Sequence, residues 1–223
     1  MAAPAVVSTA LRTLDAINAR HPWSHNDVYA PGVLHHARRV AAAGGTRAVD
    51  VGCGTGNLLR RLAAVLPDVT GVEPDERSAG LAAEATADLP GVTVRHAAFG
   101  PLPERSVDLV TFVASLHHMP PEPTLTAARA ALRPGGRLVV VGRYRDTPAD
   151  RYHSWASLAL NPVVGLVKHP RRATSLPPHM TCPIREPQEP FEQIAATMRS
   201  LLPGVHVRRG LFWRYVAVWT APR

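Results

Sequence analysis

A glycine-rich segment near residue 50 constrains the fold of this chain more than any other feature. The run A-V-D-V-G-C-G-T-G-N occupies residues 48–57, and leucines at helical spacing begin at Leu58. The apolar residues 48–51 predict a buried parallel strand, and the leucines predict a helix. Glycines between the two allow a tight turn and let a ligand approach main-chain N–H groups at the start of the helix. The segment therefore predicts a strand, a turn and a helix that together hold a cofactor.

The spacing of the glycines distinguishes two classes of cofactor. A dinucleotide-binding turn carries glycine at its first, third and sixth positions. Here the glycines are Gly52, Gly54 and Gly56, and Asn57 occupies the sixth position. This spacing favours a nucleoside cofactor, and a nucleotide-dependent oxidoreductase is the weaker alternative. Glu73, at the end of the next predicted strand, is placed to accept hydrogen bonds from both hydroxyls of a ribose.

The motif V-D-V-G-C-G-T-G, together with Glu73 in V-T-G-V-E-P-D, resembles the class I S-adenosylmethionine-dependent methyltransferases of the small-molecule, type 11 kind. The resemblance is strong over residues 48–142 and weaker over a C-terminal hairpin. It implies an α/β fold: a Rossmann-like, seven-stranded, mostly parallel sheet with an antiparallel last strand and helices on both faces. It also implies S-adenosylmethionine as the cofactor, S-adenosylhomocysteine as the product, and a small molecule as the methyl acceptor at oxygen, nitrogen or carbon.

The length of 223 residues suits one α/β domain and is too short for two. Within a single domain of residues 1–223 we expect an N-terminal helical cap (1–45), a cofactor-binding core (46–142), a variable substrate lid (143–190) and a C-terminal helix with a β-hairpin (191–223). Prolines in the lid argue against one long helix there.

Periodicity and turn residues predict the individual elements. Helices are expected at residues 6–19, 31–43, 57–66, 121–132 and 191–202, with one more ending at Ala87. Strands are expected at 48–51, 69–73, 92–95, from Ser106 onward, and at 137–142, 205–211 and 215–220. The short F-W-R connection between the last two strands indicates an antiparallel hairpin.

The resemblance assigns a cofactor site to the glycine turn and to the ends of the following strands. Its residues are Asp50, Gly52, Cys53, Gly54, Gly56, Asn57, Glu73, Pro74, Ala97, Ala98, Phe99, Ala114 and Ser115. Asp50 and the turn amides would hold the methionine end, and Glu73 the ribose. Many relatives have an Asp for the adenine amino group where this chain has Ala97; main-chain groups near Phe99 would replace it, with the Phe99 ring covering the adenine. This departure supports one alternative, a cofactor-binding regulatory or assembly protein without transferase activity.

Histidines are the candidates for a general base. His117 and His118 follow the fourth predicted strand, at the sheet edge where ligands bind in open α/β folds. Imidazole can remove a proton near neutral pH, although one of the two could instead brace the loop or contact the methionine part of the cofactor. His25 is a third candidate because it lies in a polar and aromatic loop, residues 21–29.

The same loop supplies candidates for the acceptor site. The substrate residues that we expect are Trp23, Tyr29, His118 and Trp155. The alternative for the loop is a simple lid, in which Trp23 packs on the core and Asp27 caps the following helix. No metal site is expected.

The composition bears on possible partners. The formal net charge is +8, but Lys168 is the only lysine, and the arginines are scattered without the basic runs of a nucleic-acid-binding face. We therefore expect no nucleic acid, while an anionic small substrate stays open. Cys53 and Cys182 do not indicate a disulfide framework or a metal cluster. Without a signal sequence or an apolar run of about 20 residues, we expect a cytoplasmic monomer or homodimer that does not bind membranes.

Overall fold

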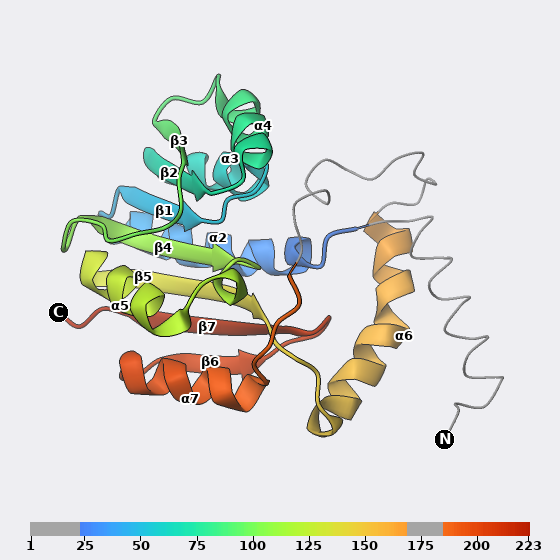
Figure 1. Cartoon of the computed structure of the whole chain (residues 1–223). Coiled ribbons are helices and arrows are strands. Elements are labelled where there is room, and N and C mark those ends of the chain that lie inside the picture. The colour runs from blue at the N-terminus through green and yellow to red at the C-terminus, as the bar shows by residue number, and fades with distance from the viewer. Residues whose placement is uncertain (1–22, 169–184) are drawn as a thin grey trace.

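A seven-stranded sheet forms the centre of the computed structural model, which describes residues 23–168 and 185–223 (Figure 1). The strands are β1 (Arg47–Val51), β2 (Asp68–Glu73), β3 (Val92–His96), β4 (Val107–Val113), β5 (Leu132–Arg143), β6 (His206–Arg209) and β7 (Arg214–Thr220). Their order is β3-β2-β1-β4-β5-β7-β6. The first five are parallel, and β7 inserts antiparallel between β5 and β6. The predicted α/β fold and its C-terminal hairpin are thus confirmed.

Helices cover both faces of the sheet (Figure 1). One face carries α2 (Asn26–Ala42), α3 (Asn57–Ala63) and α4 (Glu76–Thr86), and the other carries α5 (Pro121–Ala131) and α7 (Phe191–Leu201). Strand β5 shows why both layers form. Leu138 and Val140 are buried toward α5 and α7, whereas Val139 and Val141 are buried toward α2 and α3. Because a parallel strand covered on both faces has no polar side, the apolar run of β5 is continuous.

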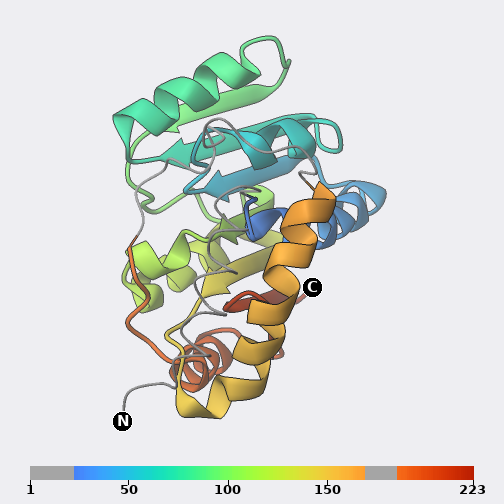
Figure 2. The same cartoon turned by 90° about the vertical axis from the view of Figure 1, so that its right-hand side faces the viewer.

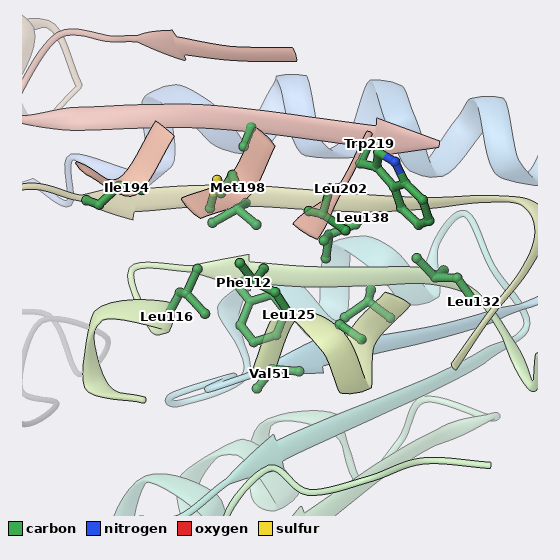
Figure 3. Packing of buried hydrophobic residues seen from close by; sticks show 14 of the residues in the cluster. Val51, Phe112, Leu116, Leu125, Leu132, Leu138, Ile194, Met198, Leu202 and Trp219 are labelled. Carbon is green, nitrogen blue, oxygen red and sulfur yellow. The ribbon is translucent and has the colours of Figure 1, made fainter. Parts of the chain in front are cut away.

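The core beneath α5 and α7 is closely packed (Figure 3). Leu125 of α5 and Met198 of α7 point toward Phe112 of β4, and all three side chains are at most 1% exposed. Trp219 closes this core near the end of β7, where its indole N–H donates to the Pro203 carbonyl at 3.0 Å. This core therefore holds α5 and α7 on one face of the sheet, and the carboxyl ends of the parallel strands remain available for a site.

Helix α2 begins earlier than the sequence predicts. It starts at Asn26, so residues 26–29 belong to its first turn rather than to a loop, and Pro31 lies inside it. Proline removes one main-chain hydrogen bond from a helix. Burial of Val33, Ala37 and Val40 on the sheet outweighs that loss. The expected helix at residues 6–19 lies outside the described residues.

The proposed helix cap by Asp27 is wrong. His25 occupies the N-cap position of α2, and its side chain makes no capping hydrogen bond. The Asp27 carboxylate instead accepts from Asn57 Nδ2 at 3.2 Å and pairs with Arg61 at 3.4 Å. Asp27 therefore ties α2 to α3, the helix that follows the glycine turn.

The expectation of a broken helix in the lid is also wrong. Helix α6 (Arg151–Lys168) directly follows the 3₁₀ turn η2 (Pro148–Asp150) and continues through Pro162. A second 3₁₀ turn, η1 (Leu116–His118), lies between β4 and α5. Pro162 is buried together with Ser157 and Gly165, so packing holds the helix across the proline. Figure 2 shows α6 crossing in front of the sheet edge. None of the described helices is long and apolar enough to span a bilayer.

Candidate active site

The glycine turn has the backbone that the sequence predicts. Gly52, Gly54 and Gly56 adopt φ angles of 70°, 55° and 81°, a region that other residues rarely enter. A Cβ added to Gly52 would lie 2.4 Å from Ser115 Cβ, because the turn passes directly under the end of β4. The Ser115 hydroxyl donates to the Val51 carbonyl and holds β1 and β4 together at this point. The turn therefore tolerates no side chain at Gly52.

Glu73 ends β2 beside this turn. Its Oε2 accepts from the Gly54 main-chain N–H at 2.9 Å, and its Oε1 accepts from the Asp75 N–H at 3.0 Å. A carboxylate oxygen can accept a second hydrogen bond, so both oxygens keep capacity for the hydroxyls of a ligand. The donors and acceptors here fit a ribose.

Asp50 is the most deeply buried acid of the site. Its Oδ1 accepts from the Thr111 hydroxyl at 2.7 Å, and only 2% of the residue is exposed. Burial raises the pKa of Asp50 to about 7; the Thr111 hydrogen bond lowers the pKa and the nearby Glu73 raises it. A positively charged ligand group next to Asp50 would favour its ionised form. This end of the site is therefore suited to a cation.

One cavity of about 1160 Å³ joins the glycine turn to the ends of β4, β5 and β7 and to helices α2 and α6. This volume exceeds the range of about 300–1,000 Å³ that is usual for a single small ligand. Most of the predicted site residues line it: Trp23, His25, Asp50, Gly52, Cys53, Gly54, Asn57, Glu73, Pro74, Ala114, Ser115, His117 and His118. Trp23 is compatible with both interpretations of its loop. It is 5% exposed, as expected for a residue packed on the core, and it lines the cavity, as expected for a residue of the acceptor site.

Other predicted cofactor residues lie outside the cavity wall. Gly56 is the N-cap of α3 and faces Ala82 of α4. Ala97 donates its N–H to the Glu73 carbonyl at 3.0 Å, and Ala98 is exposed. The Phe99 ring stands edge-on to Phe112, with centroids 5.7 Å apart, and is partly buried against the core.

Two predicted substrate residues are also displaced from the cavity. The Tyr29 hydroxyl donates to the Leu211 carbonyl at 2.7 Å, which directs the ring toward the hairpin turn. Trp155 is 63% exposed on the outer surface of α6. Both were inferred from aromatic character, which does not report the direction of a side chain on a helix.

The three histidines line the same cavity, His117 and His118 from η1 just after β4, and His25 from the position before α2. The rings of His117 and His118 are 4.3 Å apart on η1. Burial lowers the pKa of His117 to about 3, with His118 and Arg143 adding to the effect, and its Nδ1 has no hydrogen-bond partner among the described residues. Burial, and then Arg185, lower the pKa of His118, while Glu73 opposes them.

His25 reaches the same region from α2. Its Nε2 lies 3.0 Å from Asn161 Oδ1 of α6, and the Trp23 indole N–H donates to the Asn161 carbonyl at 3.2 Å. Burial, followed by Arg214, lowers the pKa of His25 to about 4. All three histidines are therefore neutral at pH 7. No group of three or more His, Cys, Asp or Glu side chains in the described part of the chain is arranged to hold a metal ion.

The cavity wall also includes residues that sequence reasoning missed. Arg143 ends β5, Arg214 begins β7, and both line the cavity together with Asn26 and Asn161. The position of Arg143 after the apolar run of β5 was a usable signal, because the carboxyl ends of parallel strands face the site. Arg214 had no such signal, since its place beside Arg143 depends on the register in which β7 pairs with β5.

Comparisons with known proteins agree with this geometry. The family described as Methyltransferase domain matches residues 49–140. An uncharacterized methyltransferase of Mycobacterium tuberculosis is 35% identical over 191 residues, which cover 80% of this chain and 89% of that protein. The trans-aconitate 2-methyltransferase of Methylobacterium nodulans is 39% identical over 104 residues, covering 46% of this chain and 40% of that protein. The crystal structure of a SAM-dependent methyltransferase from Aquifex aeolicus shares the fold, with a TM-score of 0.51 at 16% identity over 82% of this chain and 88% of that one.

Proposed function

This chain belongs to the class I S-adenosylmethionine-dependent methyltransferases, and we propose that it methylates a small molecule by in-line displacement. The name of the trans-aconitate relative supports a small-molecule acceptor. The observation that carries the proposal is one cavity that is lined both by the glycine turn with Glu73 and by the histidines. Such a cavity has room for a cofactor and an acceptor side by side.

The residues present fit the cofactor. Asp50 and the amides of the glycine turn would hold its cationic methionine end, and Glu73 its ribose. Bound S-adenosylmethionine supplies a methyl group on an already activated sulfonium. The chain has to orient the acceptor and exclude water, and Trp23 and Asn161 of α6, which are hydrogen-bonded to each other in the cavity wall, would contribute to both. The alternative of an inactive binding protein depended on the absence of an Asp at position 97. Because Ala97 lies outside the cavity wall, this absence gives the alternative no support.

His118 is the proposed general base for an oxygen or nitrogen acceptor. His117 has a pKa of about 3 and is a poor proton acceptor at neutral pH, so we assign it a hydrogen bond to the acceptor through its unpartnered Nδ1. His25 is fixed by Asn161 and would position α6 over the cavity.

Calorimetric titration tests the function itself. We expect the purified protein to bind S-adenosylmethionine and S-adenosylhomocysteine, and not NADH. Small molecules would then be screened as acceptors by the S-adenosylhomocysteine that they produce. Binding of NADH alone would overturn the proposal, as would failure of the first two ligands to bind.

The histidines predict a pH dependence. Because the pKa of His118 is lowered from its usual 6.5, its base form is fully populated at pH 7, and the single-turnover rate should fall as the pH drops through the lowered pKa. His118→Ala should reduce the rate about 10²-fold or more at pH 7 and remove this acidic limb. His117→Ala should keep the limb. A wild-type rate and profile in His118→Ala would show that the enzyme acts by positioning alone.

A further inference from the structure

Arg214 is a buried cation without a carboxylate partner. The residue is 8% exposed at the start of β7. Its Nε donates to Asn26 Oδ1 at 3.2 Å and its Nη1 to the Phe212 carbonyl at 3.3 Å, and no Asp or Glu of residues 23–168 or 185–223 pairs with it. Residues 1–22 and 169–184 contain a single carboxylate, that of Asp15. A buried charge that is held only by neutral groups is costly, which calls for a compensating anion.

A second guanidinium lies directly beside it. The antiparallel register pairs Arg143 of β5 with Arg214 of β7, and like charges at directly opposite positions are destabilising. Arg143 pairs with Glu186 at 3.0 Å, but the Glu186 side chain is 76% exposed, and such a pair contributes little. Both arginines line the cavity. The fold therefore gathers two cations on one wall and supplies one exposed carboxylate for them.

The acids of the glycine turn and the two arginines lie on different strands of the sheet, with β4 between them. Asp50, Glu73 and Asp75 lie at the glycine turn, while Asp27 is engaged by Asn57 and Arg61, and Asp146 by Ser154. Besides Glu186, the arginines are accompanied in the cavity wall by the cation Arg145 and by groups that are neutral at pH 7: His25, His117, His118, Asn26 and Asn161. Although burial, and then Arg143, lower the pKa of Arg214 to about 10, its guanidinium stays protonated. The part of the cavity wall that β5 and β7 form is thus positively charged.

We propose that Arg214 and Arg143 form a receptor for a carboxylate group of the methyl acceptor, a substrate class that rests on the proposed function. Glu186 offsets only part of the charge of the two guanidinium groups, and a ligand carboxylate would offset more of it. The planar guanidinium also matches the planar carboxylate in a two-bond contact.

Thermal unfolding in the presence of model ligands tests the receptor. Sodium benzoate, benzamide and phenyl phosphate would be compared at equal ionic strength. At a concentration about tenfold above its dissociation constant, benzoate should raise the unfolding midpoint by about 3 °C, while benzamide should have no effect. Arg214→Met should abolish the benzoate shift. Arg47→Met is the matched control, because Arg47 pairs with Asp68 at 2.9 Å at the far end of β1 and should leave the shift intact.

Each outcome decides the proposal. Equal shifts with benzoate and benzamide, a larger shift with phenyl phosphate, or a benzoate shift retained in Arg214→Met would overturn it. If Arg214→Met does not fold, Arg143→Met replaces it and should reduce the benzoate shift. Titration with S-adenosylhomocysteine distinguishes failure of the receptor from failure of the proposed function. If S-adenosylhomocysteine binds but benzoate shows no preference, the methyltransferase proposal stands and the receptor is overturned. If benzoate raises the midpoint but S-adenosylhomocysteine does not bind, the receptor stands and the methyltransferase proposal is overturned.

Discussion

Glu73→Ala is expected to lower the affinity for S-adenosylmethionine at least about 100-fold while the protein stays folded. A hydrogen bond to a charged group contributes about 1.5–3 kcal/mol, and the variant would lose two such bonds to the ribose. It would also lose the acceptor that holds the Gly54 and Asp75 amides, at 2.9 and 3.0 Å, in the ligand-free protein. The turn and the ribose contact thus depend on the same carboxylate.

Calorimetry with S-adenosylmethionine measures this loss, and two variants make it specific. Glu73→Gln keeps one oxygen acceptor without the charge and should show an intermediate affinity. Glu76→Ala removes an exposed carboxylate from the first turn of α4 and should bind as the wild type does. Thermal unfolding would confirm that all three variants are folded. Unchanged affinity in Glu73→Ala would show that the ribose is held elsewhere.

Gly52→Ala is expected to destabilise the protein by about 3 kcal/mol and to abolish cofactor binding. The left-handed backbone, with φ at 70°, costs a residue with a Cβ about 1–2 kcal/mol. The new methyl group would also lie 2.4 Å from Ser115 Cβ, and Ser115 is held by its hydrogen bond to Val51. Overpacking of this kind adds about 1–3 kcal/mol and displaces the turn amides.

Gly135→Ala separates the two causes. Gly135 has a φ angle of 80°, but an added Cβ would meet no atom within 4 Å. It should therefore lose only the conformational part, about 1–2 kcal/mol, and keep its affinity for S-adenosylhomocysteine. Urea unfolding and calorimetry would measure both quantities. Equal losses of stability in the two variants, or normal ligand binding by Gly52→Ala, would contradict the assignment of Gly52 to the cofactor turn.

The glycine turn and the acids beside it could be placed from the sequence because their signals are local. The turn at Gly52, Gly54 and Gly56 needs backbone angles that glycine adopts without strain. Glu73 is the last residue of β2 and Asp50 the last but one of β1, and because these two strands are parallel neighbours, both acids lie at the same edge of the sheet. Phe99 marks the limit of such reasoning, since an aromatic residue near a strand end packs against the core as readily as against a ligand.

The motifs and periodicity of the sequence, with the family resemblance that they carry, were sufficient for the α/β class, the order of most elements, the glycine turn and the position of His117 and His118 after β4. Long-range packing settled the rest. Helix α6 continues through Pro162 because burial of the proline stabilises the helix. Local helix propensity does not include this contribution. Arg143 and Arg214 meet because β7 inserts antiparallel beside β5 in one particular register. The part of the cavity wall that carries these two arginines arises from pairing between distant segments. Their burial and their mutual repulsion exist only after the sheet has assembled.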